Sequence, residues 1–133
     1  MRRRDDGQIT VMTIGFFLVI ALLGVVVVNA SQAFLERREL DNLADGAALA
    51  AADGLDEEVF YRSGEVSADT RTARDRVARY LAGSGAQITA IRTTDGSITV
   101  VLRRTIDLAL APPGFPAQTT ITTEATSQLR SGS

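Results

Sequence analysis

Residues 9–28 read ITVMTIGFFLVIALLGVVVV, in which only two threonines and two glycines interrupt the apolar residues. A helix rises about 1.5 Å per residue, so about 20 residues cover the roughly 30 Å of hydrocarbon in a bilayer. Backbone polar groups in lipid must be satisfied within the segment, so we expect a helix despite the many β-branched side chains. The run therefore predicts a membrane-spanning helix.

The rival interpretation of this run is a secretory signal that is cleaved from the chain. The three arginines at residues 2–4 would form its basic start, and cleavage would fall within residues 29–31. The apolar run is longer than the ~7–15 residues usual in such signals, and residues 29–31 match a cleavage site poorly. We therefore favour an uncleaved signal anchor.

Basic residues on the two sides of the span predict its orientation. Residues 2–4 precede it, whereas only Arg37 and Arg38 follow it closely. Segments rich in Lys and Arg stay in the cytoplasm, and acidic neighbours count for little in this rule. We expect a single-pass protein of the cytoplasmic membrane, with residues 1–8 inside, 9–28 in the membrane and the C-terminal domain extracytoplasmic.

The helical pattern continues beyond the span, because no proline occurs before Pro112. Small and apolar residues recur at three- and four-residue spacings, which predicts one face of a helix. They are Ala33, Leu40, Leu43, Ala44, Ala47, Ala48 and Ala51. Gly46 permits a local bend, and Gly54 is the expected end of a rod that runs from Ile9 to Asp53. Residues 29–54 are thus interpreted as a helical stalk.

The stalk face consists mostly of alanine, at Ala44, Ala47, Ala48 and Ala51. Small residues at such spacings let two backbones approach closely. Alanine is also the strongest helix former, so composition by itself explains part of the pattern. If these alanines form a helix-packing face, two packing partners are possible: the chain's own sheet and a neighbouring copy of the chain.

Residues 55–130 are expected to form one small α+β domain. Residues 55–66 read as a connector, and Ser67 is a candidate N-cap for a second helix that ends at the glycines within 83–85. From Gln87 onwards the apolar residues alternate with polar ones, which predicts strands. The runs are 87–94, 97–110 and 118–129.

Turn residues separate these three runs. Asp95-Gly96 is a strong hairpin signal, and the three prolines within 111–116 predict a loop because they deny a strand its donors. The prediction is a membrane-anchored α+β protein with a long N-terminal transmembrane and stalk helix, one short helix and a three-stranded antiparallel meander.

One face of that sheet must be covered, and the stalk and the second helix are the available cover. In the middle run the face carries Ile98, Val100, Leu102, Ile106, Leu108 and Leu110. Arg104 interrupts it, for which we expect a bulge or a sheet edge rather than a buried functional cation.

Composition removes most kinds of catalysis. The 133 residues include no Cys, His or Trp, and all 14 basic residues are Arg. The chain therefore has no thiolate, imidazole or lysine to activate a nucleophile, and no usual zinc site or P-loop. With a net charge of −2, nucleic acid is not an expected partner. We predict no enzyme, no cofactor and no metal; the function should lie in membrane anchoring and protein contacts.

Residues 5–54 resemble the N-terminal segment of TadE/TadG-like pilus-assembly proteins of Tad/Flp pilus systems, of the actinobacterial type. The resemblance rests on Gly7-Gln8 after arginines and acids, the span, the polar join at 29–32, and Arg37-Arg38. Its most specific part is the block LDNLADGAALA, residues 40–50.

This resemblance implies a pilin-like minor subunit or assembly factor. Its partners would be the membrane and other pilin-like or Tad secretion proteins, with self-association as a further expectation. Pilin-like members are cut after a glycine, which makes Gly7 and Gln8 the candidate processing site. Such members usually carry Glu at the fifth mature position, where this chain has Met12.

A different class of function stays open beside the pilus role. The chain would then be a bitopic cell-envelope protein whose extracytoplasmic domain binds a wall polymer or a secreted partner. The Thr-rich third run, as an exposed strand edge, would suit strand addition. Neighbouring genes for a secretion ATPase and Tad membrane proteins would favour the pilus role.

Overall fold

The computed structural model describes residues 3–61, 66–94 and 96–129, and the side chains of 3–6, 56–61 and 66–69 are left aside. Its elements are, in chain order, helices α1 (Arg3–Tyr61) and α2 (Val66–Tyr80) and strands β1 (Gln87–Thr94), β2 (Ser97–Asp107) and β3 (Gln118–Gln128). The predicted fold class, a long apolar N-terminal helix, one short helix and a three-stranded antiparallel sheet, is confirmed.

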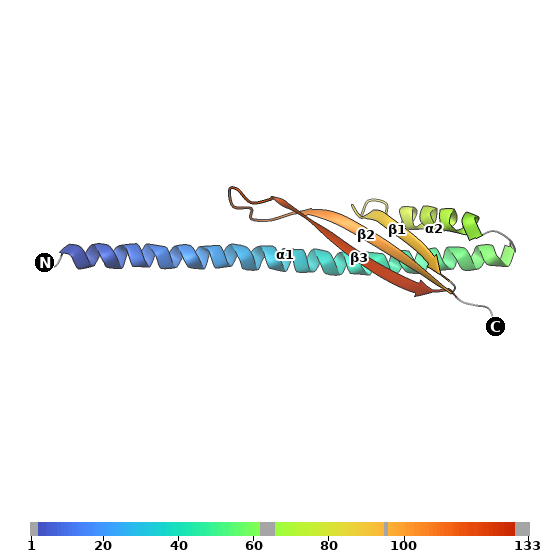
Figure 1. Cartoon of the computed structure of the whole chain (residues 1–133), viewed down its shortest axis with the longest axis horizontal. Helices are drawn as coiled ribbons and strands as arrows, with labels where there is room; N and C mark the ends of the chain where they lie inside the picture. Colours follow the sequence, from blue (N-terminus) through green and yellow to red (C-terminus); the bar gives the residue numbers. More distant parts are fainter. Residues whose placement is uncertain (1–2, 62–65, 95, 130–133) are drawn as a thin grey trace.

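Helix α1 is the spine of the molecule. Its 59 residues correspond to a rod about 88 Å long. The sheet lies across the C-terminal half of this rod with α2 beside it, and the N-terminal half extends away from both (Figure 1). Among the described residues one helix, α1, is long and apolar enough to cross a membrane; its most apolar stretch has a mean hydropathy of 3.0 and none of it is buried within the chain.

The predicted end of the first helix at Gly54 is wrong, because α1 continues to Tyr61 through much of the expected connector. The glycine serves close packing instead of termination. A Cβ at Gly54 would lie 2.9 Å from Cδ of Arg76 on α2, so a larger residue here would displace the Arg76 side chain. Leu55, the next residue, is buried as well, which shows that the contact with the rest of the chain extends past the glycine.

Gly46, nearer the N-terminus of α1, also allows close packing between α1 and α2. The helix is unbroken at this residue, and a Cβ there would overlap the hydroxyl and ring of Tyr80. Glycine in a helix costs about 1 kcal/mol relative to alanine. Here the close contact between α1 and α2 offsets that cost. Helix α2 begins at Val66, one residue before the predicted cap Ser67, a difference within the usual scatter of helix ends.

The sheet is the predicted meander with strand order β1-β2-β3. Thr94 pairs with Ser97, which leaves two residues for the first turn; Asp95 lies outside the described residues, and Gly96 has the positive φ of 86° that such turns require. Strand β1 carries a bulge between Ile88 and Ala90, whereas β2 and β3 pair without interruption. Strand β2 ends at Asp107, so the predicted tail of the middle run belongs to the loop that follows.

The core lies between one face of the sheet, the C-terminal half of α1 and α2. As the alternation predicts, β2 contributes every second residue, and α2 with the turn after it contributes three residues at four-residue spacing. The buried apolar set comprises Ile98, Val100, Leu102 and Ile106 from β2, Ala125 from β3, Ala73 and Val77 from α2, Leu81 from the turn after it, and Leu40, Ala44, Ala47, Ala48, Ala51, Ala52 and Leu55 from α1. Burial of one large aliphatic side chain contributes about 1.5–3 kcal/mol, so this cluster holds the domain onto the helix.

Candidate functional site

The two halves of helix α1 differ in how far the rest of the chain covers them. Residues 7–35, here called the bare half, carry almost only exposed side chains, and Phe17 for example is 66% exposed. From Leu40 onwards one face of the helix is buried under the chain's own sheet and α2. The bare half has no charged residue, and the first charge after it is Glu36. The surface that the fold leaves available is therefore apolar and helical.

The predicted packing residues lie on the part of α1 from Leu40 onwards, here called the covered half. Ala44, Ala47, Ala48 and Ala51 are fully buried in the chain's own core, together with the apolar face of β2. Their methyl groups let the sheet lie close to the helix axis, as small residues allow. In this fold they present no surface to a neighbouring copy, which would have to contact α1 elsewhere.

Gly7 and Gln8 both lie in the first turns of α1, and Gln8 is exposed. Met12 follows on the same helix, at the edge of the bare half. Cleavage after Gly7 stays a prediction.

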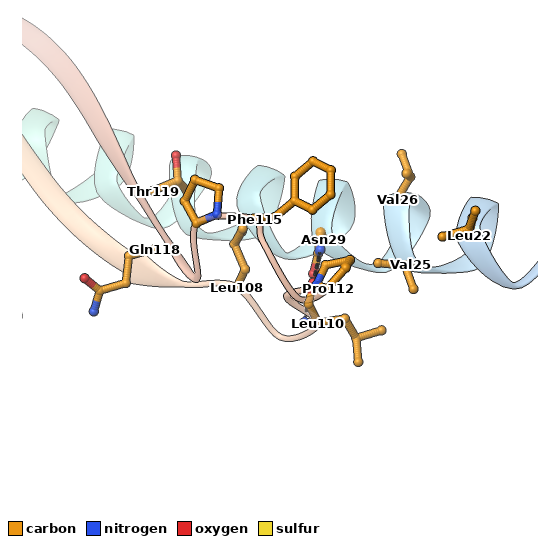
Figure 2. A pocket seen from close by; sticks show the side chains of 11 residues that line it. Leu22, Val25, Val26, Asn29, Leu108, Leu110, Pro112, Phe115, Gln118 and Thr119 are labelled. Atoms are coloured by element: carbon orange, nitrogen blue, oxygen red, sulfur yellow. Dashed lines mark hydrogen bonds between the residues drawn. The ribbon is translucent and has the colours of Figure 1, made fainter.

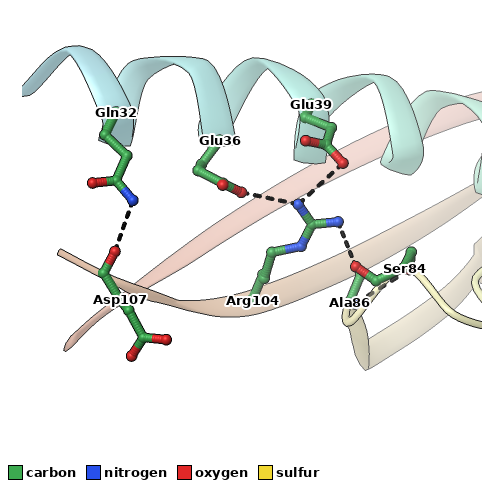
Figure 3. Close-up of polar contacts among 7 residues, drawn as sticks. All are labelled: Gln32, Glu36, Glu39, Ser84, Ala86, Arg104 and Asp107. Carbon is green, nitrogen blue, oxygen red and sulfur yellow. Dashed lines mark hydrogen bonds and ion pairs between the residues drawn. The ribbon is translucent and has the colours of Figure 1, made fainter. Parts of the chain in front are cut away.

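Arg104 fastens the sheet to α1 where the bare half ends. Its Nη1 lies 3.1 Å from a carboxylate oxygen of Glu36 and 3.3 Å from one of Glu39, and its Nη2 donates to the backbone carbonyl of Ser84 at 2.6 Å (Figure 3). The residue is only 9% exposed, and its Nε has no hydrogen-bond partner. One guanidinium thus joins β2, α1 and the turn after α2.

For Arg104 the prediction is a bulge or a sheet edge rather than a buried functional cation. No bulge occurs, because its pairing with Ile121 on β3 continues in register, and the side chain is buried, contrary to the prediction. On the other side, pairing with β1 stops at Arg103, so β2 does become an edge at Arg104. That edge is covered by the turn after α2, which brings the Ser84 carbonyl to the guanidinium. A planar fork with several donors can satisfy two carboxylates and a carbonyl together, which the ammonium of lysine does less well.

Two amide side chains of α1 hold the backbone that follows β2. Asn29 donates to the carbonyl of Leu110 at 2.5 Å and accepts from the N–H of the same residue at 3.1 Å. Gln32 donates to the carbonyl of Asp107 and accepts from the N–H of Ala109, both at 2.8 Å. Each amide therefore makes a donor–acceptor pair with main chain, as a neighbouring strand would.

These amides explain the polar join in the sequence. Asn29 and Gln32 are three residues apart, so they lie on one face of α1, and that face meets the chain after β2. A further contact joins β3 to α1, where the Thr123 hydroxyl donates to the Asp41 carboxylate. The partners are 68 to 82 residues apart in sequence, so no local pattern reveals the pairing.

We expect Asn29→Asp to loosen the backbone after β2. The carboxylate keeps an acceptor for the Leu110 N–H, but it has no donor for the Leu110 carbonyl and places two oxygens face to face. The loss should be about 1–3 kcal/mol in the free energy of unfolding, the usual cost of an unsatisfied polar group. Amide hydrogen exchange of residues 108–110 in detergent-solubilised protein measures it locally. Asn42→Asp, at an exposed position of α1, is the matched control; equal exchange in the two variants would contradict the prediction.

A groove of about 400 Å³ lies between α1 and the loop of residues 108–117, here called the proline loop. Leu22, Val25, Val26 and Asn29 form one wall, and the other is formed by the loop and the start of β3 (Figure 2). Its lining is mostly apolar and includes Leu108, Pro112 and Phe115 from the loop. The groove belongs to the bare half of α1, at the end nearest the sheet.

The described residues contain no group of three or more His, Cys, Asp or Glu side chains placed to hold a metal ion. The two carboxylates that do come together, Glu36 and Glu39, are engaged by Arg104. The arrangement thus provides an apolar helical surface on α1. Polar contacts join the folded domain to the helix at the border of this surface.

Comparison with known proteins identifies part of this helix. Residues 7–54 match the model of the family described as "Putative Flp pilus-assembly TadE/G-like". The matched stretch contains the bare half of α1, the polar join and the buried alanine face. The resemblance to TadE/TadG-like proteins is thereby confirmed for these residues. Neither the curated proteins nor the solved structures yield a match to the chain.

Proposed function

We propose that this chain, which carries a TadE/G-like Flp pilus-assembly domain over residues 7–54, is a minor pilin-like component of a Tad/Flp-type pilus or a related secretion system. The family is structural rather than catalytic, which agrees with the chemistry that the composition lacks. In this role the bare half of α1 anchors the chain in the membrane and is the surface through which it joins other subunits.

The observation that carries the proposal is that the family match falls on a helix that is half bare. A helix covered on every side would serve only its own domain. Here residues 7–35 are uncharged, and those before Val25 are exposed around the helix, while the domain is packed on the same helix further along. Such a rod can insert its first half among lipids or other apolar helices and hold its domain clear of them.

The localisation is part of the proposal. Residues 9–28 cross the cytoplasmic membrane, residues 1–8 stay in the cytoplasm by the charge rule, and residues 55–130 form the extracytoplasmic domain at the end of the stalk, 29–54. The partners are other pilin-like or Tad secretion proteins, and contacts between copies of this chain would also use the bare half.

The test is complementation in the native host. The gene is deleted, and surface filaments are counted by electron microscopy and by the yield of sheared protein. We expect filaments to be lost and to return with the wild-type gene. A variant in which residues 9–28 are replaced by an alternating leucine–alanine span of equal length should insert in the membrane and yet restore few filaments.

Two results would contradict the proposal. Normal filaments in the deletion strain would remove the pilus role. Full restoration by the leucine–alanine span would show that residues 9–28 serve only as an anchor, and would remove the proposed contact between the bare half and other subunits. Carbonate extraction of both variants verifies that they are inserted to the same extent.

A further inference from the structure

The proline loop lies beside the end of the membrane span and the first residues of the stalk. The groove that it forms with α1 is lined by Leu22, Val25 and Val26, in the last third of the span predicted from sequence, and by Asn29, the first residue of the stalk. Seven residues of helix correspond to roughly 10 Å along the axis. The loop therefore descends alongside the part of α1 that would lie in one leaflet.

The loop has the composition of a segment that can enter that leaflet. From Leu108 to Thr123 no residue is charged, and the first charge on α1 beyond the span is Glu36. Two of its large apolar side chains line the groove and still stay accessible, with Leu110 44% and Phe115 71% exposed. In a soluble environment these side chains would gain nothing from their position; in a membrane they extend the apolar surface of α1.

The backbone of the loop is also suited to a medium poor in water, where unsatisfied polar groups cost several kcal/mol each. Pro112, Pro113 and Pro116 have no N–H. Of the seven other N–H groups of the loop, four have acceptors: Leu108 donates to the Ala117 carbonyl, Ala109 to Gln32, Leu110 to Asn29 and Phe115 to the Pro112 carbonyl. The amides of α1 thus satisfy main chain at the level where lipid would begin.

We propose that the proline loop inserts into the leaflet at which α1 leaves the membrane, and that the groove beside Leu22–Asn29 holds a phospholipid acyl chain. The proposal rests on the membrane anchoring by α1 that the proposed function requires. It adds a second membrane contact, at Leu110 81 residues after Asn29 in sequence, that fixes how the domain sits on the bilayer.

The absence of tryptophan from the chain makes a direct test available. Full-length variants with a single tryptophan are reconstituted in phosphatidylcholine vesicles that carry a doxyl quencher near the headgroup or near the end of the acyl chain. Phe115→Trp reports the loop. Phe17→Trp reports the span, and Leu49→Trp, 57% exposed on the covered half of α1 and about 30 Å beyond Asn29, reports a similar exposed site outside lipid.

We expect Phe115→Trp to emit at shorter wavelength than Leu49→Trp and to lose its emission to the quencher near the headgroup. Phe17→Trp should be quenched more by the label near the chain end. Quenching of Phe17→Trp but not of Phe115→Trp would overturn the loop proposal and leave the anchor intact. Failure to quench Phe17→Trp would instead overturn the anchor, and the loop proposal with it.

One further outcome concerns a protein occupant of the groove. A blue-shifted Phe115→Trp that no lipid label quenches, and whose shift disappears when protein is diluted into excess lipid, would place a second copy against the loop and overturn the lipid proposal. Because Phe115 is largely exposed, its replacement should not disturb folding, and circular dichroism of the three variants verifies this.

Discussion

The double variant Ala44→Leu, Ala48→Leu is expected to lose the packing of the domain on α1 while its membrane insertion is unchanged. Both alanines are fully buried between the helix and the sheet face of β2. Added carbon atoms in a well-packed core cost about 1–3 kcal/mol per site. Two such changes in one layer would remove a large part of the ~5–15 kcal/mol that stabilises a typical domain.

The measurement is urea unfolding of detergent-solubilised protein followed by limited proteolysis of residues 66–129. Ala30→Leu, at an exposed position of α1, is the matched control and should unfold as the wild type does. A stable double variant that nevertheless fails to assemble would contradict the fold. It would mean that the alanine face meets a neighbouring copy, the other partner that the sequence leaves open.

Arg104→Ala is expected to lower the free energy of unfolding by about 2–3 kcal/mol, somewhat less than the ~3–5 kcal/mol for breaking a fully buried pair. The reduction follows from exposure, because the side chains of Glu36 and Glu39 are 31% and 63% accessible and keep much of their water. The Ser84 carbonyl loses its guanidinium donor in this variant. The contact between β2 and α1 should loosen at the border of the bare half.

Arg103→Ala is the control, since Arg103 is the preceding residue on β2 and is exposed to solvent. Its loss should change the free energy of unfolding by less than about 0.5 kcal/mol, as is usual for surface substitutions. Arg104→Lys should fall between the two, because lysine retains the charge without the planar fork. Equal stability of Arg103→Ala and Arg104→Ala would show that the Arg104 contacts contribute nothing.

The elements of this fold that rest on local patterns were predictable. Twenty apolar residues in a row leave a spanning helix as the main interpretation. The alternation of Ile98, Val100 and Leu102, with Gly96 before it, predicts a hairpin strand. The buried face of β2 follows that alternation, and even Arg104 keeps its phase, with its side chain on the apolar side.

What could not be predicted depends on contacts between distant residues. Gly54 has the local character of a helix end, but the nearby Arg76 side chain makes it a point of close packing. Arg104 breaks an apolar pattern, and only the fold shows the acids of α1 beside it. Asn29 and Gln32 mark the polar join, yet their partners are backbone groups, which carry no signature in the sequence.

We propose that α1 stays whole in the native protein, as the membrane anchor and as the spine of the domain. Cleavage of a secretory signal within residues 29–31 would cut an unbroken helix and separate the anchor from the Asn29 contacts. Intact-mass and N-terminal analysis of the native protein, from washed membranes and from sheared surface material, tests this directly. We predict an N-terminus before Ile9 in the membrane fraction; Gln8 as the first residue would add processing after Gly7. A soluble protein that begins beyond Asn29 would contradict the account.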